Sequence, residues 1–189
     1  MKRIIIPILS LFMLGCGDDP LPKPKGYLRL EYPNAVYKKV TLPLPFTFEK
    51  NELSERISSV NTLGDLRGID IKYPSLKATI YLTYKTVEND NLDSLLRDAQ
   101  NLTQKHTVKA DEILPKEFLN IENKIYGMIY EIGGDVASQS QFYVTDSTKH
   151  FLSGSLYFNA KPNYDSIYPA SEYLKKDIMR IMETIQWKD

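Results

Sequence analysis

The chain has 189 residues with 24 basic and 24 acidic side chains, so its formal charge is zero. This length is enough for one domain whose core needs no disulfide or metal, and the balanced charge argues against a nucleic-acid-binding protein, which needs a clustered basic surface. The sequence contains a single cysteine, Cys16, so no disulfide can form within the chain.

The first 15 residues have the pattern of a signal peptide. Lys2 and Arg3 precede an apolar run over residues 4–14, which is too short to cross a bilayer because a spanning helix needs about 20 residues. Residues 13–16, Met-Leu-Gly-Cys, resemble a bacterial lipobox, although methionine replaces the commoner leucine. We therefore expect cleavage before Cys16, and its acylation with chains such as palmitate, since two or more chains give stable anchoring.

The alternative for Cys16 is a buried structural cysteine, which is the usual role of a free cysteine. That alternative is disfavoured because the only cysteine directly follows the apolar run. Loss of the leader leaves 22 basic and 24 acidic side chains, a formal charge of −2. Residues 16–26 are predicted to be the lipidated cysteine and a proline-rich tether, since three prolines in five residues exclude a helix or a central strand. The folded domain is expected over residues 27–189.

Alternating apolar and polar residues predict the strands of the first half of this domain. The expected strands are residues 27–32, 46–49, 68–73 and 77–86. Pro74 and Ser75 supply a hairpin turn between the last two strands. Residues 51–61 are expected to hold a turn or two of helix. A longer helix is predicted from Leu92 to His106, because polar residues 89–91 can cap its first turn and apolar residues follow at helical spacing.

The second half predicts a three-stranded meander and a final helix, whereas residues 108–122 have no clear pattern. A strand over residues 125–132 leads through Gly133-Gly134 into the stretch 136–158, which alternates from Phe142 onward. Both faces of that stretch carry aromatic side chains, which places it in the middle of a sheet that is covered on each side. After a polar loop over residues 159–169, Ser171 is predicted to cap a helix that runs through Thr184. Trp187 is expected to fold back onto the sheet.

No set of residues in the chain names a chemical reaction. Asp146, His150 and Ser153 have the residue types of a hydrolase triad, but neither a nucleophile elbow nor an oxyanion hole surrounds the serine. We interpret the first two as a turn aspartate and a strand-edge histidine. His106 and His150 do not match a zinc spacing, and the acidic cluster Glu88, Asp90 and Asp93 lacks the glycine and closing glutamate of an EF-hand.

We therefore predict no metal, no cofactor and no enzymatic activity. Some polar and aromatic residues near the last helix could instead form a surface for an unknown ligand or a partner protein. These candidates are Tyr157, Asn163, Asp165 and Tyr168. For the last three, the alternative is that they are ordinary turn residues.

Motifs along nearly the whole chain are similar to those of one known family. They are Cys16-Gly17-Asp18-Asp19, Leu28-Arg29-Leu30-Glu31-Tyr32-Pro33, Ile71-Lys72-Tyr73-Pro74, Tyr130-Glu131-Ile132-Gly133-Gly134, Phe142-Tyr143-Val144-Thr145-Asp146-Ser147 and Leu156-Tyr157-Phe158-Asn159. In this order and spacing they resemble the gliding-motility lipoprotein family GldD. The resemblance implies an outer-membrane lipoprotein that faces the periplasm and serves gliding motility and type IX secretion. It brings no catalytic residues to this chain.

The order strands, helix, strands, helix predicts an α+β fold, with an antiparallel sheet of about six strands and helices on both faces. This order also resembles the PsbP/Mog1-like α/β/α sandwich. Our leading hypothesis is a lipid-anchored, non-enzymatic accessory or assembly factor, whose partners are the membrane and other gliding or type IX secretion proteins. The alternative is a periplasmic module that binds cell-wall glycan or lipid through Tyr157 and the loop 159–169.

Overall fold

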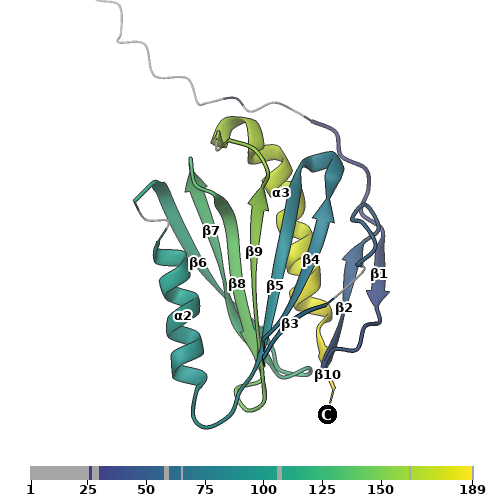
Figure 1. Ribbon diagram of the computed structural model, residues 1–189. Coiled ribbons are helices and arrows are strands. Elements are labelled where there is room, and N and C mark those ends of the chain that lie inside the picture. The colour runs from purple at the N-terminus through teal and green to yellow at the C-terminus, as the bar shows by residue number, and fades with distance from the viewer. Residues whose placement is uncertain are drawn as a thin grey trace, which may run out of the picture.

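A large antiparallel sheet runs through the middle of the molecule (Figure 1). The computed structural model describes residues 26, 30–57, 60–64, 66–105, 108–161 and 163–188. Within this part of the chain, seven strands lie in the order β3-β4-β5-β9-β8-β7-β6. Their bounds are β3 Asn61–Leu63, β4 Leu66–Tyr73, β5 Ala78–Thr86, β6 Ala110–Asn120, β7 Ile125–Gly134, β8 Ser138–Thr145 and β9 His150–Phe158. The central position predicted for the stretch 136–158 is thus confirmed, because β8 and β9 lie in the middle of this order.

A second, smaller sheet and the long C-terminal helix cover one face of the large sheet. The small sheet has the order β1-β2-β10, with bounds β1 Tyr37–Val40, β2 Phe46–Asn51 and β10 Gln186–Trp187. Helix α3 (Tyr164–Thr184) buries one apolar side in the main core. The core side chains that it contributes are Leu174, Ile178, Ile181 and Met182. They pack in one cluster with apolar residues of β4, β5, β8 and β9, which fixes α3 against the sheet.

Helix α2 (Leu92–Gln104) lies on the opposite face of the sheet (Figure 1). Successive side chains of a strand point to opposite faces, so Phe142 and Val144 enter the main core while Tyr143 packs against Leu95 of α2. The prediction of helices on both faces is therefore confirmed. However, α2 covers its face less completely than α3, because its buried residues are only Leu95 and Thr103.

The large sheet has seven strands where about six were predicted. The predicted strand 46–49 lies in the small sheet as part of β2, and two strands that were not predicted form the edges of the large sheet, namely β3 and, over residues 110–120, β6. Pro115 within this strand pairs with Tyr130 of β7, and an edge strand tolerates proline because one of its sides has no neighbouring strand. Two other predictions were wrong in the described residues. Residues 30–36 form no strand, and residues 52–57 form a turn and irregular chain where a helix was expected. Residues 27–29 lie outside the described part.

Both helices begin in a different way from that predicted. Helix α3 starts at Tyr164 after an Asn163 cap, whose side chain accepts from the Ser166 N–H at 3.4 Å, so Ser171 is a buried interior residue of the helix. Pro169 lies inside this helix. Asn91 precedes α2 without a side-chain capping bond, because its Oδ1 accepts from the Glu88 N–H at 3.1 Å instead. His106, the predicted end of α2, lies outside the described residues.

Candidate functional site

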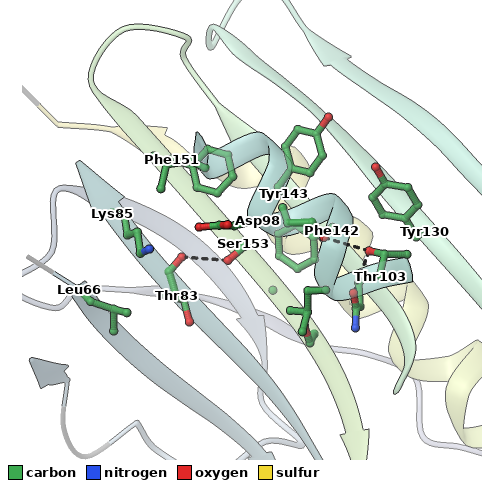
Figure 2. Close-up of a pocket in the computed structure, with 16 residues that line it drawn as sticks. Leu66, Thr83, Lys85, Asp98, Thr103, Tyr130, Phe142, Tyr143, Phe151 and Ser153 are labelled. Atoms are coloured by element: carbon green, nitrogen blue, oxygen red, sulfur yellow. Dashed lines mark hydrogen bonds between the residues drawn. The ribbon is translucent and has the colours of Figure 1, made fainter. Parts of the chain in front are cut away.

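A cavity of about 220 Å³ lies between α2 and the sheet (Figure 2). Its helix side is formed by Leu95, Ala99 and Leu102, and its sheet side combines aromatic rings with hydroxyl groups. The aromatic part consists of Tyr130, Tyr143 and Phe151, and the hydroxyl part consists of Thr83, Ser153 and Ser155. One basic and one acidic residue, Lys85 and Asp98, also line it. The cavity is thus amphipathic and carries no excess of either charge.

Small residues in the middle of β9 create this space. Ser153, Gly154 and Ser155 pair with Tyr143, Phe142 and Gln141 of β8, and the two serines project toward α2. Gly154 is required on the other face, because a Cβ atom there would overlap the Phe142 ring. A strand with larger side chains at positions 153 and 155 would fill the gap under α2, so the sequence of β9 leaves the cavity open.

Polar and aromatic contacts fix the walls of the cavity. Thr103 on α2 donates its hydroxyl to Gln141 Oε1 at 2.9 Å, which ties the helix to β8. The Tyr143 and Phe151 rings are stacked with their centroids 5.8 Å apart. Burial raises the pKa of Tyr130 and of Tyr143, so both phenols stay protonated at neutral pH and can donate hydrogen bonds.

Tyr157 belongs to the same face of β9 as Ser153 and Ser155. Its ring meets the Tyr81 ring of β5 edge to face, with centroids 5.8 Å apart. Tyr81 is 39% exposed, and burial raises the pKa of Tyr157. The structure therefore places Tyr157 beside the cavity beneath α2, on the side toward β5, and pairs it with a tyrosine that the sequence does not single out.

The other three candidate residues lie in the first turns of α3 and do not join Tyr157. Asn163 and Asp165 line an open hollow that Lys109, Asp111, Asp135 and Lys161 complete. Tyr168 lines a separate hollow beside Glu131 and packs against the Tyr164 ring at 5.3 Å between centroids. Asn163 also caps the helix, which agrees with its interpretation as a turn residue.

Asp146, His150 and Ser153 do not form a triad. His150 and Ser153 project from opposite faces of β9, because they are three positions apart along the strand. Burial alone would raise the pKa of Asp146, but the backbone N–H groups of Thr148, Lys149 and His150 donate to it and hold the pKa below its usual value. The His150 ring lies 2.8 Å from the Tyr84 hydroxyl and stacks on Trp187 at 4.9 Å. Trp187 folds back onto the sheet as predicted.

No group of three or more metal-binding side chains occurs among the described residues. His106, which was considered as a zinc ligand from sequence, lies outside them. Glu88, Asp90 and Asp93 therefore supply no calcium site there. The cavity walls offer hydroxyl, phenol and aromatic groups for recognition.

A buried carboxylate on the α3 side of the molecule has no counterpart in the sequence-based predictions. Asp177 is 1% exposed and accepts from the Tyr37 hydroxyl at 2.7 Å and from Asn51 Nδ2 at 3.1 and 3.2 Å. Burial raises its pKa, although these donors oppose the shift. Asp177 lies between Leu174 and Ile178 on the apolar side of α3, so a charged residue within an apolar stripe was the available sequence signal.

A family model described as gliding motility lipoprotein GldD matches residues 17–187. No curated protein and no solved structure matches the chain. Neither α2 nor α3, nor any other helix in the described residues, is long and apolar enough to cross a membrane.

Proposed function

Because this chain belongs to the GldD family of gliding motility lipoproteins, we propose that it is a non-enzymatic accessory or assembly factor for gliding motility and type IX secretion. The observation that carries this proposal is the match over residues 17–187, which begins directly after Cys16. The proposed organisation is a signal peptide over residues 1–15, a lipidated Cys16 with its tether to residue 26, and one domain over residues 27–189. Cys16 and most of this tether lie outside the described residues.

The proposed location is the outer membrane, with the domain facing the periplasm and other envelope proteins of these machineries as partners. A fixed entry point of the tether into the domain supports this role. Tyr32 stacks on Tyr173 of α3 at 4.9 Å, and the Tyr173 hydroxyl donates to the Pro33 carbonyl at 3.0 Å. These contacts hold residues 32 and 33, near the start of the continuously described chain, against helix α3. An anchored domain would thereby present a defined side to its partners.

Replacement of the proposed anchor tests this function. The Cys16→Ala variant should fold but leave the membrane fraction and lose gliding and type IX secretion, because its tether carries no acyl chains. Fractionation, immunoblotting of secreted proteins and colony spreading measure these effects. Met13→Leu, which restores the commoner lipobox residue, should behave as the wild type. Full motility and secretion with soluble Cys16→Ala protein would refute the anchoring proposal.

A second candidate function is a ligand-binding module for cell-wall glycan or lipid. The cavity beneath α2 is the observation that favours it, because ligand sites are concave and combine apolar walls with a few polar groups. In this version Tyr157 contributes its ring on the α2 face of the sheet. The two hollows near the start of α3, one lined by Asn163 and Asp165 and the other by Tyr168, are separate candidate surfaces for partners.

We also infer that the chain has the PsbP/Mog1-like α/β/α sandwich. The support is a long antiparallel sheet with α2 on one face and α3 on the other. This is an analogy of fold, so it contributes nothing to the functional proposal.

A further inference from the structure

A continuous strip of uncharged hydroxyl-bearing side chains extends from the cavity along one face of β5 and β9. We call it the hydroxyl–tyrosine strip, and its members are Thr79, Tyr81, Thr83, Ser153, Ser155 and Tyr157. The register pairs Thr83 with Ser153, Tyr81 with Ser155 and Thr79 with Tyr157. Thr83, Ser153 and Ser155 line the cavity. Since alternate residues of a strand share a face, all six side chains lie on the α2 side of the sheet.

Beyond the cavity, the surface of the strip is formed by the exposed Tyr81 and the half-buried Tyr157, whereas Thr79 and Ser155 are buried. In Figure 1, α2 lies toward the β6 side of the sheet, and α3 lies behind β4 and β5. Tyr81 is 39% exposed and its ring meets Tyr157 edge to face. One exposed and one half-buried phenol ring thus lie directly beside the cavity. Exposed aromatic rings with a polar edge are typical of recognition surfaces.

The charge around the strip is balanced at both ends. Lys85 and Asp98 line the cavity end. At the other end the register places Asp70 beside Tyr81 and Lys72 beside Thr79. Neither end therefore has the excess of positive charge that would attract nucleic acid or an anionic lipid surface. The strip itself has no charged member, so it matches a neutral ligand.

The size of the cavity limits what can enter it. At about 220 Å³ it is smaller than the roughly 300–1,000 Å³ of ordinary small-molecule pockets, so it holds one ring-sized group. The remainder of any larger ligand must lie outside the cavity, against Tyr81 and Tyr157. An acyl chain is a poor match for this path, because it would cover the strip's hydroxyl groups without giving them hydrogen-bond partners.

We propose that the cavity and the hydroxyl–tyrosine strip together bind a neutral, linear oligosaccharide. One sugar ring occupies the cavity and the next rings lie on Tyr81 and Tyr157. A sugar ring offers an apolar C–H face to an aromatic side chain and a rim of hydroxyls to Ser and Thr, which both donate and accept hydrogen bonds. This inference rests on the second function proposed above, and it selects glycan over lipid as the ligand class.

Titration calorimetry on the mature, lipidated chain in detergent tests the proposal. The probe is the β-1,4-linked tetramer of N-acetylglucosamine, compared with the monomer of the same sugar. The tetramer should bind at least about tenfold more tightly than the monomer, because only the tetramer reaches the strip. Tyr81→Ala and Tyr157→Ala should each weaken tetramer binding at least about tenfold while leaving the weak monomer binding unchanged.

Matched variants separate binding from folding. Tyr126→Ala removes a half-buried tyrosine from the same sheet face outside the strip and should bind as the wild type. Thr83→Val keeps the shape of the side chain and removes a cavity hydroxyl. It should weaken the binding of both the tetramer and the monomer several-fold. Tyr157→Phe keeps the aromatic ring and should therefore retain most of the affinity for the tetramer. Thermal unfolding of each variant verifies that it is folded, and Tyr81→Ala changes an exposed residue.

Several outcomes would overturn the proposal. Equal affinity for monomer and tetramer, or unchanged tetramer binding in Tyr81→Ala and Tyr157→Ala, would show that the strip is not a binding surface. Binding of laurate without binding of the tetramer would refute the glycan and leave the lipid version of the second function. If neither the tetramer nor laurate binds, both this inference and the ligand-binding function are refuted. The assembly-factor proposal would then stand separately on the Cys16→Ala experiment.

Discussion

Gly127→Ala is expected to lower the free energy of unfolding by more than about 3 kcal/mol, because it forces two strands apart. Gly127 lies in β7 opposite Val144 of β8. A Cβ atom at this position would overlap the Tyr143 carbonyl oxygen and come within 2.9 Å of Val144 Cγ1. Every residue of β8 is buried, so the obstructing carbonyl cannot move without disturbing the core. Urea denaturation of the purified chain measures the loss.

Gly68→Ala is the matched control, since it makes the same change in β4 of the same sheet. The nearest neighbour of a Cβ atom at Gly68 is 3.7 Å away, which is ordinary contact. The free energy of unfolding of this variant should stay within about 1 kcal/mol of the wild-type value. Any change should come from the lower conformational entropy of the unfolded chain. A Gly127→Ala protein with the wild-type denaturation midpoint would contradict the close approach of β7 and β8.

Alternation of side chains was sufficient to predict the central strands. In residues 142–158, apolar and aromatic side chains occupy both faces, and the structure buries β8 completely and most of β9. The edge strand β6 could not be found in this way, because none of its residues is buried. An exposed strand has no buried face to require alternation, and Pro115 argues against a strand until its edge position is known.

The candidate site could be predicted only in part, because it depends on register and on the fit of a helix. Tyr157 is recognisable as an aromatic residue in a strand, but its pairing with Tyr81 follows from how β5 and β9 meet. Likewise, Ser153 and Ser155 appear in sequence as the polar half of an alternation. That they line a cavity depends on α2, whose burial is incomplete, and the apolar spacing of a helix does not specify how closely it packs.

Asp177→Ala is expected to lower the free energy of unfolding by about 2–4 kcal/mol at acidic pH, because Tyr37 and Asn51 lose their shared acceptor. The same substitution should lower the free energy of unfolding by a smaller amount as the pH rises. Burial raises the pKa of Asp177 in the folded protein above its ordinary value of 3.8. Between the pKa of Asp177 in the unfolded protein and its higher pKa in the folded protein, the folded state therefore binds more protons than the unfolded state. The contribution of Asp177 to the stability of the wild type falls as the pH rises through this window.

Denaturation midpoints of the wild type and Asp177→Ala between pH 3 and pH 8 measure this difference. The comparison is needed because Glu131 and Asp146 have lowered pKa values, so their contributions to stability are lost as pH falls. Both proteins contain these two groups, and their effect cancels in the difference. Glu183→Ala, an exposed change on the same helix, should alter stability by less than about 0.5 kcal/mol. A difference that grows with pH would show that the hydrogen bonds from Tyr37 and Asn51 outweigh burial and lower the pKa of Asp177.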